Sequence, residues 1–130
     1  MGKMETKYNF FLEKLEHISD IKAVYTVDAS DKAIYPYIVI DIPNKNPFDG
    51  VSDEVFLDID IWHKSSSGKD VFYAIEGIAD EVESKLNKLF CDDSEHTYLI
   101  NQIGRIRIPD TERYIQRRKL KYQIKAYNRY

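Results

Sequence analysis

The chain contains a single cysteine, Cys91. One thiol cannot form an intramolecular disulfide, and it cannot supply a cysteine-based metal cage. The sequence also has no apolar run that approaches the length of a membrane span, and its charged, amphipathic N-terminal segment lacks the pattern of a secretory signal peptide. We therefore expect a protein that is made and used in the cytosol, with no membrane partner.

Internal repeats and low-complexity segments are also absent, and 130 residues fit one domain, residues 1–130. A chain of this length can bury a hydrophobic core without disulfides or metals. Its hydrophobic fraction of 43% is normal for a globular protein. Ten tyrosines and six phenylalanines make the chain rich in aromatic residues, which serve both cores and interfaces.

The small net charge of −3 conceals a strong asymmetry along the chain. From Arg105 to the end, nine basic residues face only two acidic ones, so this segment carries +7 and the preceding residues carry −10. Such a basic end suits contact with nucleic acid. It equally suits head-to-tail contact between identical subunits, in which a basic edge meets an acidic face.

Hydrophobic periodicity predicts an α+β fold: a mainly antiparallel sheet with two helices packed on one face, in the order α-β-β-β-α-β-β. The predicted helices cover residues 4–19 and 69 to about 90, and residues 91–95 are an acidic break. The predicted strands cover residues 21–28, 35–42, 54–62, 96–108 and 114–128.

Strict alternation within the strands predicts which side chains share a face. In the third strand, one face carries Val55, Leu57, Ile59 and Ile61, and the other carries Phe56, Asp58, Asp60 and Trp62. In the last strand, Leu120, Tyr122, Ile124 and Ala126 are predicted to face inward. In the fourth strand, Tyr98, Ile100, Ile106 and Ile108 are predicted to share a face, and Gly104 indicates a bulge or bend.

No complete catalytic motif is present, and we predict no catalytic, cofactor-binding or metal-binding residue. Asp58, Asp60 and His63 have the residue types of a metal site or metal-dependent nuclease, but alternation alone places polar residues on the outer face of a strand. The segment 65–69 is similar to the end of a phosphate-binding loop. However, His63 stands where that loop needs glycine, and Asp70 stands where it needs serine or threonine.

The order of elements and several local patterns resemble the phage tail terminator, or tail-completion, family, which includes the lambda-type minor tail protein that caps the tail. The similar features are the unit VFLDIDIWHKSSSGKDVFYAIEGIADEVESKL, the N-terminal helix and the closing pair of strands, RIRIPD and RYIQRRKLKYQIKAY. In the unit, a strand ending at Trp62 precedes a polar loop and a helix. The resemblance spans nearly the whole chain.

The resemblance implies a structural protein without catalytic residues, which assembles as a hexameric ring on the tail of a phage or prophage. It implies contacts with the tail tube protein and with the head-completion protein, and DNA passing through the ring without specific binding. Assembly would take place in the cytoplasm of a bacterial host. The alternative class is a nucleic-acid-binding module that uses the basic C-terminal strand.

Three sets of residues are candidates for the roles that a ring would require. The predicted oligomer interface consists of Trp62, Arg117, Arg118, Lys119, Lys121, Tyr122 and Lys125. The predicted mobile docking loop contains Asn44, Lys45, Asn46, Pro47, Phe48 and Asp49. The residues expected to face the lumen, where negative charge would limit sticking of DNA, are Asp41, Asp58 and Asp60.

Overall fold

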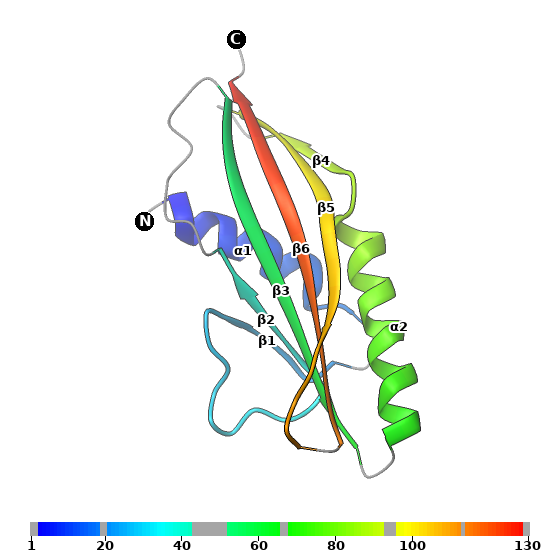
Figure 1. The fold of residues 1–130 in the computed structure, drawn as a ribbon. Helices are drawn as coiled ribbons and strands as arrows, with labels where there is room; N and C mark the ends of the chain where they lie inside the picture. The colour runs from blue at the N-terminus through cyan, green and yellow to red at the C-terminus, as the bar shows by residue number, and fades with distance from the viewer. Residues whose placement is uncertain are drawn as a thin grey trace.

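The computed structural model describes residues 3–18, 21–42, 52–65, 68–92, 96–112 and 114–128. Within these residues, two helices and six strands form an α+β fold (Figure 1). In chain order, the elements are α1 (Lys3–Leu15), β1 (Ala23–Thr26), β2 (Tyr37–Asp41), β3 (Ser52–Lys64), α2 (Gly68–Leu86), β4 (Leu89–Asp92), β5 (His96–Ile108) and β6 (Ile115–Asn128).

The strands form one mixed, curled sheet in the order β1-β2-β3-β6-β5-β4. The pair β1 and β2 is parallel, and the other four neighbouring pairs are antiparallel. The three long strands β3, β6 and β5 lie side by side. β6 pairs with β3 along the whole length of β3, and β5 pairs with the other edge of β6. The predicted class is thus confirmed, while the sheet has one strand more than predicted.

The additional strand is β4, which the sequence pattern assigned to the end of the second helix and the acidic break. That assignment is wrong because α2 ends at Leu86, and Lys88 adopts a left-handed conformation with φ of 61°. A left-handed residue is a common helix terminator. Leu89 continues the apolar spacing of the helix in the sequence. In the structure it follows the turn at Lys88, belongs to β4, and packs against the core from there.

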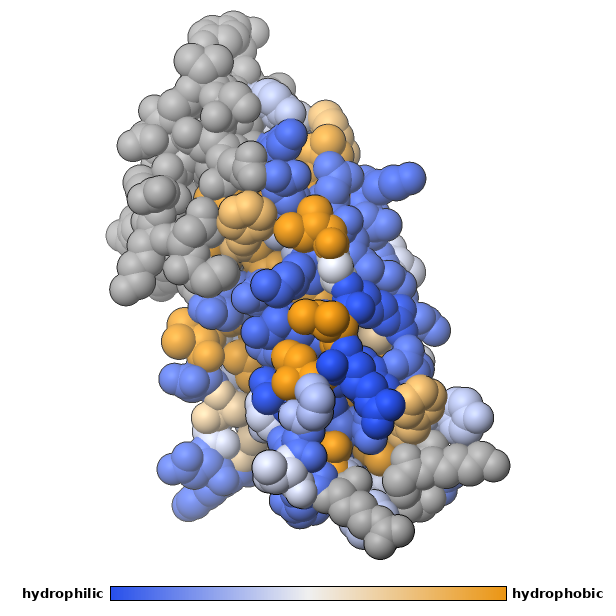
Figure 2. Space-filling view, viewed as in Figure 1, coloured by the Kyte–Doolittle hydropathy of each residue, from blue (hydrophilic) through white to orange (hydrophobic). Residues whose placement is uncertain are grey.

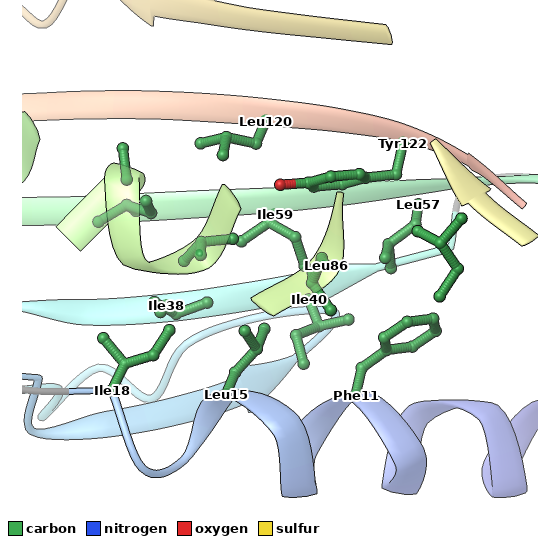
Figure 3. Close-up of a cluster of buried hydrophobic side chains, with 14 of the residues drawn as sticks. Phe11, Leu15, Ile18, Ile38, Ile40, Leu57, Ile59, Leu86, Leu120 and Tyr122 are labelled. Carbon is green, nitrogen blue, oxygen red and sulfur yellow. The ribbon is translucent and has the colours of Figure 1, made fainter. Parts of the chain in front are cut away.

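One continuous hydrophobic cluster joins both helices to the same face of the sheet. Figure 3 shows Phe11 and Leu15 of α1, and Ile18 just after the helix, pointing toward Ile38 and Ile40 of β2. From α2, the buried members are Ile75, Ile78, Ala79, Val82 and Leu86. The alternating residues of β3 predicted to face inward are buried, as are Leu120, Tyr122 and Ile124 of β6, so the alternation of these two strands was predicted correctly.

The fourth predicted strand, now β5, contains a bulge between Gln102 and Gly104. The bulge itself was predicted, but the prediction that Tyr98, Ile100, Ile106 and Ile108 share a face is wrong. Because one extra residue is inserted, the alternation inverts after Gly104. Ile106 and Ile108 therefore pair with Lys119 and Arg117 on the face away from the helices.

The connection between β1 and β2 begins with a sharp turn at Val27. The amide of Asp28 donates a hydrogen bond to the carbonyl oxygen of Thr26 at 2.8 Å, and Val27 between them has φ of 70°. This combination is the γ-turn with positive φ, which is rare and strained. A β-branched side chain makes the conformation more costly still.

Candidate functional site: the uncovered face of the sheet

The face of the sheet away from α1 and α2, here called the open face, is not covered by either helix. In Figure 1 the long strands lie in front of α1, so this view looks onto the open face. Figure 2 shows the same view, with apolar side chains running down its middle between polar ones. A sheet with one solvated face is expected to alternate in this way, but large exposed apolar groups on that face are less common.

Two rows of opposite charge lie next to each other on the open face. The acidic row consists of Asp41, Asp58 and Asp60, and the basic row consists of Arg117, Lys119, Lys121 and Lys125. The register places Asp41 opposite Asp58, Asp58 opposite Lys121, and Asp60 opposite Lys119. The structure therefore brings together residues that the sequence assigned to two separate surfaces, the lumen and the interface.

Asp60 is a largely enclosed member of the acidic row, with a side chain that is 16% exposed. Its carboxylate lies 3.9 Å from Arg117 Nη2 and 3.9 Å from Lys119 Nζ, and Oδ1 accepts no hydrogen bond from the described residues. Burial raises the pKa of Asp60 above its ordinary value, and the attraction of Lys119 and Arg117 only partly opposes this effect. The carboxylate is thus incompletely compensated within one subunit.

We expect Asp60→Asn to stabilise the protein at neutral pH, by roughly 0.5 kcal/mol. A carboxyl whose folded-state pKa is raised binds more protons when folded, so stability falls as pH rises from the unfolded to the folded pKa. Above this window the wild-type carboxylate destabilises the fold, and below it both side chains are neutral. Urea unfolding at pH 7 and at pH 3 will measure this difference. A variant less stable than wild type at pH 7 would contradict it.

Trp62 lies at the end of the open face in a cluster of aromatic side chains. Its ring stacks on Tyr37 with centroids 6.1 Å apart, and Tyr25 and Tyr35 contact the Tyr37 ring at 5.8 and 5.3 Å. On the other side, the guanidinium carbon of Arg117 lies 3.8 Å from the Trp62 ring centroid. This cation–π contact holds Arg117 in place. Trp62 and Arg117 therefore have a structural role within the subunit.

Several exposed apolar side chains lie on the open face. In the described part of the chain, eight large apolar residues are exposed: Val27, Ile34, Phe56, Tyr73, Phe90, Ile103, Ile106 and Tyr127. Pairing places Phe56, Phe90, Ile106 and Tyr127 on the open face, and the alternation before the bulge adds Ile103. Ile103 and Ile106 of β5, here called the apolar row, lie beside the basic row. Val27 and Ile34 belong to the β1–β2 loop, and Tyr73 is on α2.

Two residues of the predicted interface, Arg118 and Tyr122, are not on this surface. They point toward the helices and are 2% and 0% exposed, so a partner cannot reach them in the folded subunit. Arg118 Nε donates a hydrogen bond to Glu76 of α2 at 2.5 Å. The remaining predicted interface residues, Trp62, Lys119, Lys121 and Lys125 among them, do lie on the open face. The predicted docking loop, residues 44–49, lies outside the described residues.

The geometry gives no support to a metal site at Asp58 and Asp60. Alternation along β3 places His63 on the opposite face from these two carboxylates. Among the residues that the structure describes, no three His, Cys, Asp or Glu side chains form a group that could hold a metal ion. In the same residues, no helix is both long enough and apolar enough to cross a membrane.

Comparison with known proteins adds no assignment to this geometry. No protein-family model matches the chain, and no curated protein matches it either. The function is therefore inferred from the sequence and from the open face.

Proposed function

We propose that this chain is a structural assembly protein, a tail terminator of a phage or prophage that assembles into a ring, caps the tail tube and joins it to the head. The observation that carries the proposal is the open face, where an apolar row adjoins a basic row and an acidic row. Such a face is suited to contact with a protein, since exposed apolar groups rimmed by charge are typical of interaction sites.

The charge distribution across the sheet supports a head-to-tail arrangement. The acidic row lies on β2 and β3, whereas the basic and apolar rows lie on β6 and β5. A contact between two different surfaces of the same chain repeats around a rotation axis, and it closes into a ring when the rotation divides the circle. The hexamer, the tail tube protein and the head-completion protein enter this proposal through the family resemblance.

The lumen role of Asp41, Asp58 and Asp60 is not part of the proposal. Lys119 and Lys121 lie directly opposite Asp60 and Asp58 on the neighbouring strand. An acidic row at one strand spacing from a basic row does not produce the uniform negative field that would repel DNA. The same compensation counts against the alternative, a nucleic-acid-binding module, because it weakens the positive field that such a module needs.

Solution mass provides the test. We expect light scattering to show a mass that rises from the monomer toward a hexamer as protein concentration increases, and that falls when salt is added, because screening weakens contacts between charged surfaces. A strict monomer at every concentration and salt would contradict self-assembly. A salt-sensitive shift of DNA by that monomer would favour the nucleic-acid-binding alternative.

A further inference from the structure

We propose that the β1–β2 loop of one subunit, through Val27, Asp28, Asp31 and Ile34, docks onto the apolar row and Lys121 on the open face of the next subunit. The inference rests on the proposed self-assembly and names the two surfaces that meet. The occupant of the apolar row is therefore a second copy of this chain.

The β1–β2 loop presents two large apolar side chains to solvent. Val27 is 57% exposed and Ile34 is 67% exposed, and Asp28 and Asp31 are exposed between them. Glycine would relieve the γ-turn at Val27 in the free subunit, yet an exposed β-branched residue holds this position. Strained residues are concentrated at functional sites, where contact with a ligand or partner uses the conformation.

The receiving surface has the complementary character. Ile103 is 53% exposed and Ile106 is 48% exposed. The alternation before the bulge places Ile103 on the open face, and the bulge turns Ile106 toward the same face. Lys121 lies beside them, paired with Gly104 across the two strands. Within the described part of the chain, no salt bridge involves Lys121, Asp28 or Asp31. Apolar groups and opposite charges are thus available on both sides of the contact.

The two surfaces lie on different sides of one subunit, so they are not satisfied within it. β1 is an edge strand, and β2, β3 and β6 separate it from β5. With neighbouring strands about 4.8 Å apart, this order separates them by roughly 19 Å across the sheet. Figure 1 shows the loop extending outward beyond β1, away from α2. The contact is therefore heterologous, as ring formation requires.

The size of the loop defines its part in the interface. A stable interface buries about 800 Å² on each partner, which exceeds what one short loop supplies. A few apolar anchors at the centre of such an interface account for most of its binding energy. We assign this anchoring role to Val27 and Ile34, and the steering role to the charges that surround them.

Exchange of charge between the surfaces tests the pairing. The loop variant Asp28→Lys/Asp31→Lys and the face variant Lys121→Glu/Lys125→Glu place like charges opposite each other, and each is expected to raise the dissociation constant at least tenfold in sedimentation velocity. The chain carrying all four substitutions restores opposite charges with the polarity reversed, so its assembly should recover. An equimolar mixture of the loop and face variants should also assemble.

Apolar variants provide a second, independent measurement. Val27→Gly is expected to raise the melting temperature of the dilute monomer, because it relieves the γ-turn, and yet to weaken assembly. Ile34→Ser is expected to weaken assembly as well. The matched control is Tyr73→Ser, since Tyr73 is 65% exposed on α2, away from both surfaces.

The outcomes distinguish this inference from the proposed function. If wild-type protein assembles but the loop and face variants assemble equally well, the pairing is overturned and the ring proposal stands. If the four-substitution chain remains as weak as the single-surface variants, the two surfaces do not meet. If wild-type protein does not self-associate, the proposed function itself fails.

Discussion

Replacing Glu76 by alanine is expected to lower the free energy of unfolding by about 3 kcal/mol, because it leaves a buried charge without its partner. Glu76 lies on α2 and connects the helix to two strands of the sheet. One carboxylate oxygen accepts a hydrogen bond from Arg118 Nε at 2.5 Å, and the other accepts one from Arg105 Nη2 at 2.6 Å.

Arg118 is the residue that makes this loss large. It is 2% exposed, so water cannot replace the missing carboxylate. Its other acceptors are neutral, namely the side chain of Gln116 at 3.0 Å and the carbonyl of Arg117 at 2.9 Å. Arg105 is less affected, because Asp80 and Glu83 each accept a hydrogen bond from its Nη1 at 2.8 Å.

The same cluster predicts a direction for the effect of pH. Burial alone would raise the pKa of Glu76, but hydrogen bonds from Arg118 and Arg105 outweigh it and hold the pKa below its ordinary value. A carboxylate with a depressed folded-state pKa stabilises the fold above its unfolded pKa, and this contribution is lost as pH falls through the folded pKa. Acid should therefore reduce the difference between wild type and Glu76→Ala.

Urea unfolding at pH 7 measures the effect, with two variants as controls. Asp80→Ala removes a partner of Arg105 that is 70% exposed, and it should cost less than about 1 kcal/mol. The pair Glu76→Leu/Arg118→Met removes both charges, and it should recover most of the loss, because apolar replacement of a buried ion pair is often neutral. A double variant as unstable as Glu76→Ala would show that the loss does not arise from the unpaired arginine.

Alternation and spacing were sufficient to predict most of the fold. In β3 and β6, period-2 alternation separates the buried aliphatic residues from the charged ones, and the structure follows it without interruption. Hydrophobic spacing failed to predict β4, because one apolar residue fits both a longer helix and a strand. Leu89 continues the helical spacing of α2, and only the left-handed backbone at Lys88 ends that helix. No sequence rule strongly favours such a conformation at a lysine.

The candidate site was harder to predict because it depends on pairing between distant strands. Gly104 indicated a bulge, but its consequence for Ile106 and Arg105 follows only when the alternation is recounted from that point. In the sequence, Arg118 is one of several basic residues in the last strand. Its burial is explained only by the structure, in which Glu76 of α2 forms an ion pair with it. The acidic and basic rows became neighbours only through the register of β3 with β6.

Two isoleucines on opposite faces of the sheet should respond very differently to truncation. Ile59 in β3 faces the helices and is 0% exposed, whereas Ile106 in β5 faces solvent and is 48% exposed. Ile59→Ala is expected to lower the free energy of unfolding by about 3 kcal/mol, since it removes buried apolar area and leaves a cavity between the sheet and the helices.

Ile106→Ala should instead leave the stability of the dilute monomer within about 0.5 kcal/mol of wild type, because a solvent-exposed side chain has little packing to lose. Its effect should appear in assembly, where loss of an anchor weakens association by about 1 kcal/mol or more. Chemical unfolding and sedimentation velocity on both variants separate the two effects. If Ile106→Ala assembles like wild type, the apolar row has no part in the contact. If Ile106→Ala lowers stability as much as Ile59→Ala does, the Ile106 side chain contributes to packing within the subunit despite its exposure. The open face would then not be a surface for a partner.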